Sequence, residues 1–162
     1  MDSTTFLALA LACAPLVHPD TARAIASVES SFNPYAIGVV GGVLHRQPRT
    51  RAEALATMDA LRADGWNYSV GLGQINVGNF ERLGLTPGSA LDPCISLSAM
   101  QAVLGECYAR AASNNAAQNA LRFALSCYYS GNVSTGFRHG YVRKVVLASA
   151  AASALPNRKE RS

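Results

Sequence analysis

TARAIASVESSFNPYAIG, residues 21–38, predicts a helix that carries an acid on its buried face. Four of its residues have the i, i+3, i+4, i+7 spacing of a core-facing helix side, and the last of the four is Glu29. Asn33-Pro34 ends the helix soon afterwards, so Glu29 lies in its last turn. The negative pole of the helix macrodipole and burial both disfavour a charged carboxylate there, and we expect both to raise the pKa of Glu29. The four residues are Ala22, Ile25, Ala26 and Glu29.

A structural reading of Glu29 competes with a functional one. An acid at the edge of an apolar face can point to water or pair with an arginine, and buried acids are uncommon and usually paired. A functional role for Glu29 therefore requires a cleft, polar groups that bind a ligand, and a reaction that uses one protonated acid.

Composition favours one compact domain. The chain has 162 residues, of which 49% are hydrophobic and 15% charged, and a core of that size suits a single domain over residues 1–155. Residues 156–162 are expected to be a disordered basic tail, with three basic residues and one acidic residue. The net charge is +4, and the tail supplies +2 of it, so the body is too weakly basic for a nucleic-acid binder.

The apolar run FLALALACA, residues 6–14, is interpreted as part of the first helix of the domain. Asp2 stands where a signal peptide carries positive charge, and His18-Pro19 leads directly into the next helix. An export signal would then be missing from this chain or atypical. No apolar run approaches the ~20 residues that span a membrane, so no membrane span is expected.

The remaining pattern predicts an α+β fold that is mostly helical, with a small β-ribbon. Thr50 and Glu53 have the spacing of a capping box, with Thr50 as the N-cap of a helix that ends at Gly65. Glycines among β-branched residues at 35–47 predict a small hairpin or irregular ribbon, and 86–94 and 129–136 are expected to be loops. The other predicted helices are 4–14, 19–30, 95–112, 115–128 and 138–154.

Three polar segments interrupt the helical pattern: 29–34, 68–76 and 128–132. The first offers a carboxyl and hydroxyls, the second glycines and the amides of Gln74 and Asn76, and the third two tyrosines that can stack on sugars. Each segment alone could be an ordinary turn or helix end. If the three converge, they form a groove that suits a polysaccharide better than a phosphate or a metal.

Four cysteines lack the spacing of a zinc site and are even in number, so disulfides and buried thiols both remain open. The helices 95–112 and 115–128 should run antiparallel, which brings Cys94 beside Cys127. We therefore hypothesise a Cys94–Cys127 disulfide, worth about 3–4 kcal/mol if unstrained. Cys13 and Cys107 are left to pair or to remain free, and any disulfide requires an oxidising compartment.

The three segments resemble the motifs of the soluble lytic transglycosylase family. ESSFNP (29–34) matches the catalytic Glu-Ser motif, GLGQIN (71–76) the Gly-Leu-Met-Gln motif and YYSGN (128–132) the Tyr-Asn-Ala-Gly-like motif. Gly73 replaces the usual Met and Tyr129 the usual Asn. The resemblance covers about residues 6–147 and is strongest to the branch associated with type IV secretion systems. Further segments similar to that branch are CAPLVHPDT, NPYAIGVV, VGLGQIN, LDPC and LSCYYSGN.

The resemblance implies a lysozyme-like fold that cleaves the β-1,4 bond between N-acetylmuramic acid and N-acetylglucosamine and leaves a 1,6-anhydro end. It implies Glu29 as the sole catalytic carboxyl, with Ser30, Gln74 and Tyr128 positioning the sugar or the acid. Asn76 and Tyr129 complete the predicted substrate-binding set. Peptidoglycan strands and type IV secretion channel subunits are the expected partners, in the periplasm, with no cofactor, no metal and no nucleic acid.

The ten acids of the chain fit a mechanism that uses one carboxyl, because only Glu29 lies within the three polar segments. A glycosidase normally needs two carboxyls, whereas here Glu29 would act first as acid and then as base. The alternatives are a lysozyme-type hydrolase that uses Glu29 with water, and a scaffold that binds peptidoglycan or channel subunits with little activity. We also hypothesise that the Tyr128 hydroxyl bonds Glu29 or the sugar.

Overall fold

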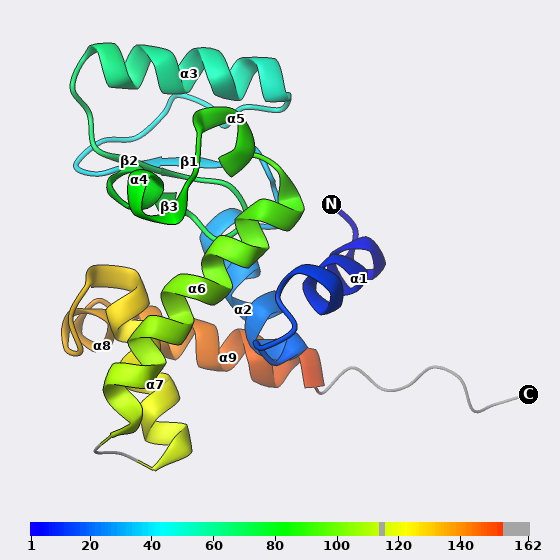
Figure 1. Cartoon of the computed structure of the whole chain (residues 1–162), viewed down its shortest axis with the longest axis vertical. Helices are drawn as coiled ribbons and strands as arrows, with labels where there is room; N and C mark the ends of the chain where they lie inside the picture. The colour runs from blue at the N-terminus through cyan, green and yellow to red at the C-terminus, as the bar shows by residue number, and fades with distance from the viewer. Residues whose placement is uncertain (114–115, 154–162) are drawn as a thin grey trace, which may run out of the picture.

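A computed structural model describes residues 1–113 and 116–153 (Figure 1). The predicted boundary at residue 155, the predicted tail 156–162, the predicted helix start at Asn115 and the predicted helix end at Ala154 lie outside these residues.

The described chain has a helical body with a small sheet at one end (Figure 1). Helix α3 (Arg51–Ala63) lies over the sheet, and the long helix α6 (Pro93–Ala112) runs from the sheet toward α7 (Ala117–Ser130). The predicted mostly helical α+β fold is therefore confirmed. The remaining elements are α1 (Ser3–Cys13), α2 (Pro19–Ser30), β1 (Ile37–Val39), β2 (Tyr68–Val70), β3 (Ile75–Asn76), the 3-10 helix η1 (Val77–Asn79), α4 (Phe80–Leu83), α5 (Pro87–Ala90), α8 (Thr135–Arg138) and α9 (Tyr141–Ser153).

Helix α2 forms as its sequence predicts. Pro19 opens it, and Ser31, with a left-handed φ of 49°, ends it. Its face of Ala22, Ile25 and Ala26 is fully buried, and α9 packs against it. The last turn of α2 therefore lies in the interior of the helical body.

The predicted capping box at α3 is only half formed. The Thr50 hydroxyl accepts the Glu53 N–H at 3.2 Å, but the Glu53 carboxylate accepts the N–H of Arg49 at 2.8 Å instead of that of Thr50. The Arg46 guanidinium, 3.2 Å away, pairs with the same carboxylate. The Glu53 carboxylate is thus held by the backbone of the residue before the N-cap and by the charged side chain of Arg46.

Residues 35–47 were predicted to form a hairpin or an irregular ribbon, and the local hairpin does not form. Strand β1 pairs antiparallel with β2, with Ile37 opposite Val70, and β2 pairs in turn with β3. The other side of β1 is covered by the Gln47 side chain, whose amide accepts from Ile37 N at 2.8 Å and donates to Ile37 O at 2.9 Å. Val70 is fully buried whereas residues 40–43 are exposed, so burial selects the distant partner strand over the local one.

Two predicted loops contain short helices. Within 86–94, Thr86 and Ser89 form a complete capping box that opens α5. Within 129–136, α7 continues to Ser130 and α8 begins at Thr135, so the last helix starts only at Tyr141. Helices α5 and α8 are single helical turns, and their sequences are too short to show the repeated apolar spacing that marks a longer helix.

The predicted Cys94–Cys127 disulfide is wrong. Cys13 bonds Cys94, and Cys107 bonds Cys127. Helix α6 is longer than α7, so Cys94 lies about 27 Å from the turn between them and Cys127 about 15 Å, a mismatch that a disulfide cannot span. Helix α1 packs on α6 instead, and its end brings Cys13 to the start of α6.

None of the helices in the described part of the chain is both long enough and apolar enough to cross a membrane.

Candidate active site

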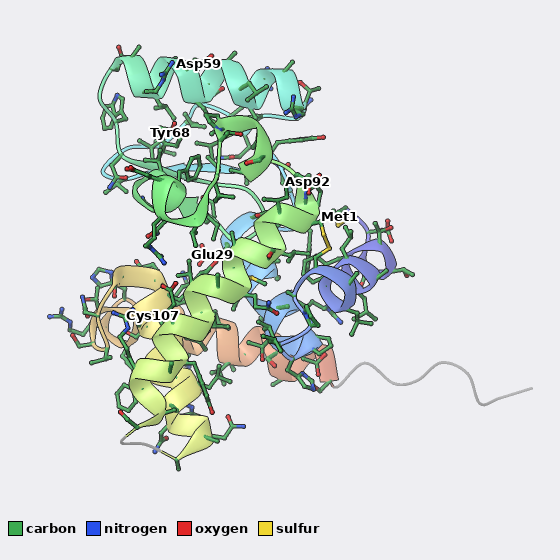
Figure 2. All side chains as sticks on the ribbon, in the orientation of Figure 1. Met1, Glu29, Asp59, Tyr68, Asp92 and Cys107 are labelled. Carbon is green, nitrogen blue, oxygen red and sulfur yellow. A yellow bond between two sulfur atoms is a disulfide. The ribbon has the colours of Figure 1, made fainter. Side chains whose placement is uncertain are left out.

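Glu29 occupies the last turn of α2, near the centre of the molecule (Figure 2). Its side chain is half-buried: part of it still reaches solvent, but protein atoms surround most of the carboxyl. Burial raises the pKa of Glu29 to about 7. The carboxyl therefore holds its proton in weakly acidic solution, as its position on the helix predicted.

Tyr141, the first residue of α9, is the aromatic partner of Glu29. Its ring is buried, and its hydroxyl lowers the pKa of Glu29, which partly offsets the effect of burial. Among the described residues this hydroxyl makes no hydrogen bond of regular geometry, so its contact with Glu29 is weaker than a well-aligned bond. Because the Tyr141 hydroxyl has no other well-aligned partner in the described part of the chain, it can donate a hydrogen bond to the Glu29 carboxylate when Glu29 ionises.

Ser30 joins the first polar segment to the second. Its hydroxyl lies 2.9 Å from the carbonyl oxygen of Ala26 and 3.0 Å from that of Leu72, and its single proton is shared between them. The next two residues, Ser31 and Phe32, have φ angles of 49° and 61°, a left-handed conformation that costs energy for residues other than glycine. Ser30 thus fixes the end of α2 that carries Glu29.

Gly73 and Tyr128 join the second segment to the third. The Tyr128 hydroxyl donates to the Gly73 carbonyl oxygen at 2.5 Å, so its proton goes to the backbone and not to Glu29. The alternative bond from this hydroxyl to the sugar stays a prediction. A Cβ at Gly73 would come within 2.8 Å of the Tyr128 hydroxyl and 3.0 Å of the Met100 Cβ. This close approach explains why glycine stands where the general motif has methionine.

Gln74 is held in a strained conformation, with a φ of 49°. Its Nε2 donates to the carbonyl oxygens of Ala36 at 2.9 Å and Gly71 at 3.1 Å. Its Oε1 lies against Gly38, where a Cβ would approach it to 2.7 Å. The side chain is therefore fixed, with its acceptor oxygen beside the bare backbone of β1.

Tyr129 stacks on Tyr141, with ring centroids 4.6 Å apart and an angle of 17° between the planes. Its hydroxyl lies 3.1 Å from the Nδ1 of His139, and 43% of the side chain is exposed. Asn76 caps η1 through its Oδ1 and donates from Nδ2 to Asn67. Tyr129 therefore offers an open aromatic face, whereas the polar atoms of Asn76 already have partners.

These residues line two connected hollows. The inner cleft contains Glu29 with Gly38, Val39, Val40, Ser69, Gln74, Tyr128 and Tyr129. The outer groove, about 490 Å³ in volume, shares Val40, Ser69, Gln74, Tyr128 and Tyr129 with the inner cleft and continues past Asn76 to Arg82, Glu106 and Arg110. Five of the six predicted site residues line one hollow or both, and Ser30 lies behind them.

Glu29 is the one acid that lines the inner cleft. The groups that shift its pKa are its buried surroundings and Tyr141, with no second carboxylate among them. Within residues 1–113 and 116–153, no cluster of His, Cys, Asp and Glu could hold a metal ion. The arrangement provides one proton donor that can also act as a base.

Tyr141 is the site residue that the sequence did not predict. It follows a glycine at the start of a helix, and its spacing to later apolar residues is that of an ordinary core position. Only the packing of α9 on α2 brings it to Glu29, and a pairing between distant helices leaves no local pattern.

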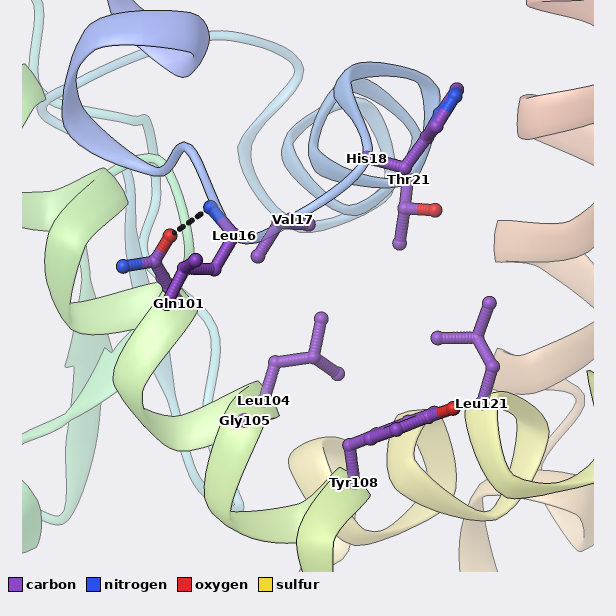
Figure 3. Close-up of a pocket in the computed structure, with 9 residues that line it drawn as sticks. All are labelled: Leu16, Val17, His18, Thr21, Gln101, Leu104, Gly105, Tyr108 and Leu121. Atoms are coloured by element: carbon purple, nitrogen blue, oxygen red, sulfur yellow. Dashed lines mark hydrogen bonds between the residues drawn. The ribbon is translucent and has the colours of Figure 1, made fainter. Parts of the chain in front are cut away.

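An apolar hollow of about 240 Å³ lies elsewhere, between the α1–α2 turn, α6 and α7 (Figure 3). The Leu16 N–H donates to Gln101 Oε1 across its edge at 2.7 Å. Its nine lining residues include no Asp or Glu, so it lacks the carboxyl that a glycosidase uses.

The family described as Transglycosylase SLT domain matches residues 6–145, which include the whole site. The chain belongs to this family. Its mostly helical α+β structure is the lysozyme-like fold that the motifs implied.

Several similar proteins carry the name virB1. The type IV secretion system protein virB1 of Brucella suis biovar 1 is 49% identical over 151 residues, which cover 89% of this chain and 63% of the relative. Protein virB1 of Agrobacterium fabrum is 46% identical, over 85% of this chain and 56% of the relative. Protein virB1 of Rhizobium radiobacter is 44% identical, over 92% of this chain and 62% of the relative.

The chain thus spans less than two thirds of the length of these relatives. No solved structure matches it. The predicted similarity to proteins of the secretion-associated branch is confirmed.

Proposed function

We propose that this protein is a peptidoglycan lytic transglycosylase that cleaves the β-1,4 bond between N-acetylmuramic acid and N-acetylglucosamine. One observation carries the proposal: Glu29, with a pKa raised to about 7, is the one acid lining a cleft walled by amides and tyrosines. Such an acid suits a reaction that needs a proton donor and then a base.

In the first step, neutral Glu29 acts as general acid. It gives its proton to the glycosidic oxygen as the bond from that oxygen to the muramic acid C1 breaks. The positive charge that develops at C1 is stabilised by the acetamido oxygen of the same sugar. N-acetylglucosamine leaves with the proton, and Glu29 is now a carboxylate.

In the second step, the Glu29 carboxylate acts as general base. It takes the proton of the muramic acid C6 hydroxyl while that oxygen bonds to C1 and closes the 1,6-anhydro ring. Glu29 regains its proton, so the cycle consumes no water. Ionised Glu29 is disfavoured by burial, which makes it a stronger base toward the C6 hydroxyl, and the nearby Tyr141 hydroxyl limits that cost.

The walls of the cleft suit a sugar chain. Tyr129 offers an exposed ring face for stacking, and Gln74 offers Oε1 to a substrate hydroxyl or amide N–H. Tyr128 and Ser30 act through the backbone, since their hydroxyls hold Gly73 and Leu72 in place. Asn76 extends the polar lining into the outer groove.

The setting of the reaction follows from the disulfides and the relatives. Two disulfides join all four cysteines, and disulfides persist in oxidising compartments, which supports the periplasm. The Brucella relatives are named as type IV secretion system proteins, so the enzyme would open the cell wall locally for such a system and contact its channel subunits.

Product analysis tests the proposal. Purified sacculi are digested with the wild-type protein and, in parallel, with Glu29→Gln, and the released muropeptides are analysed by mass spectrometry. Products one water lighter than hydrolysed muropeptides, formed only by the wild type, are the expected result. Hydrolysed ends would identify a lysozyme-type enzyme instead, and binding to sacculi without release would identify a scaffold.

A further inference from the structure

The outer groove ends in three charged side chains, two arginines and one glutamate, which together carry a net charge of +1. Arg82 and Glu106 neutralise one another, because Nη1 of Arg82 lies 2.6 Å and 2.8 Å from the two carboxylate oxygens. Arg82 also donates from Nη2 to Asn79. Arg110 therefore supplies the uncompensated charge of the groove.

Arg110 is oriented by the disulfide beneath it. Its Nη2 lies 3.3 Å from the sulfur of Cys127 and 3.6 Å from that of Cys107, and sulfur is a weak acceptor (Cys107 is labelled in Figure 2). Within the described residues it forms no ion pair, and its Nε and Nη1 donors have no acceptor. A guanidinium held in this way presents a fork of donors to an incoming anion.

Arg110 borders the outer groove, which is continuous with the inner cleft through Gln74, Tyr128 and Tyr129. A sugar chain seated on Glu29 and extended along this route reaches the arginine. In peptidoglycan the sugars are uncharged where the muramic acid carries a stem peptide, and the carboxylates belong to the stem. The anion that this route delivers to Arg110 is therefore a stem carboxylate.

We propose that Arg110 binds a stem-peptide carboxylate and makes the enzyme favour strands whose stems keep their negative charge. The inference rests on the proposed function, since it needs a glycan strand in the cleft. Arg110 contributes to substrate specificity and does not touch the reacting atoms.

The test compares two substrates that differ only in charge: soluble strands with free stem carboxylates, and the same strands after carbodiimide-coupled amidation. The wild type should lose about five- to tenfold in kcat/KM on the amidated strands, the size of one partly exposed charge-assisted hydrogen bond. Arg110→Gln should show that loss already on the free strands and no further loss on amidation. Arg110→Lys, which keeps the charge without the fork, should retain part of the preference.

Arg62→Gln is the matched control, because it removes the same charge from α3, outside both hollows. It should behave as the wild type. Added salt should reduce the wild-type preference and leave Arg110→Gln unaffected. Non-reducing peptide mapping of Arg110→Gln and of Arg110→Lys checks that the Cys107–Cys127 bond is intact.

Strand binding in a Glu29→Gln background provides a readout that does not depend on turnover. There, Arg110→Gln should weaken binding of the free strands only. An equal loss on both substrates, or equal wild-type affinity and rate for both, overturns the role of Arg110. If the role of Arg110 is overturned, release of anhydro products from amidated strands would still support the proposed function. If no digest contains anhydro products, the proposed function is refuted, and the binding measurements still decide whether Arg110 recognises the stem carboxylate.

Discussion

Two glutamates stand at opposite ends of two helices and meet opposite conditions. Glu53, in the first turn of α3, faces the positive pole of its helix, and the Arg46 side chain and the Arg49 N–H hold its pKa below the usual value. Glu29, in the last turn of α2, faces the negative pole, and burial raises its pKa to about 7. The Glu53 carboxylate accepts hydrogen bonds from a guanidinium and a backbone N–H, whereas burial and the Tyr141 hydroxyl are the influences on the Glu29 carboxyl. The environment thus separates a helix cap from a proton donor.

The largest effect expected from this contrast is on activity. Glu29→Gln keeps the size and polarity of the side chain but has no proton to give, so turnover of sacculi should fall by on the order of 10²–10⁴. Glu53→Gln is the matched control and should retain wild-type turnover, because Glu53 lies outside both hollows. Dye release from labelled sacculi measures both variants. Comparable losses in the two would mean that the contrast between the acids has no catalytic meaning.

The second effect is on stability, and its sign follows from the raised pKa. Between the usual value of 4.5 and about 7, folded Glu29 keeps its proton while the unfolded chain releases it, so stability falls as pH rises through this window. The cost is absent below the window and reaches about 3 kcal/mol above it. Glu29→Gln lacks this cost.

Urea unfolding at several pH values tests the stability effect. The free energy of unfolding of Glu29→Gln relative to wild type should rise by that amount from pH 4 to pH 8. The other titrating groups cancel in this difference. A difference that stays flat with pH would mean that Glu29 ionises in the folded protein as it does in water.

Much of this contrast could be predicted from sequence, because it depends on local position. The spacing of Ala22, Ile25 and Ala26 placed Glu29 on a buried helix end, and the residue types of the polar segments pointed to a sugar-binding cleft. Pairings between distant segments could not be predicted in the same way. The partner of β1, the partner of Cys94 and the approach of Tyr141 all depend on how whole helices pack, and packing leaves no periodic pattern in one segment.

Tyr128 illustrates the limit of the prediction within the site itself. The sequence predicted a bond from its hydroxyl to Glu29 or the sugar, and Tyr128 does line both hollows. Its hydroxyl, however, bonds the backbone of Gly73, because that glycine leaves room for close approach. Tyr141 takes the position beside Glu29 instead.

A third, smaller effect should follow from removing the hydroxyl next to Glu29. Tyr141→Phe removes the group that lowers the pKa of Glu29, so the alkaline limb of the pH–rate profile should move to higher pH. Turnover should fall about three- to tenfold, the size of one weak hydrogen bond to the ionised carboxyl. Thermal stability should be unchanged or slightly higher, because a buried hydroxyl without a well-aligned partner is lost. An unmoved profile would show that the hydroxyl does not act on Glu29.

The smallest effect belongs to Glu53, and it has the opposite pH dependence. Because its folded pKa is lowered, Glu53 stabilises the protein above its usual pKa, and this stabilisation is lost as pH falls through the folded pKa. Glu53→Gln should therefore lower the melting temperature slightly at pH 7, less so in high salt, and progressively less at acid pH. Thr50→Ala should cost more, about 1 kcal/mol at either pH, because the Thr50 hydroxyl caps the helix without a charge. If Glu53→Gln destabilised the protein equally at neutral and acid pH, the cause would be the geometry of the new amide and not the loss of the charge of Glu53. The charge at the start of α3 would then have no measurable effect on stability, and the electrostatic contrast with Glu29 would fail.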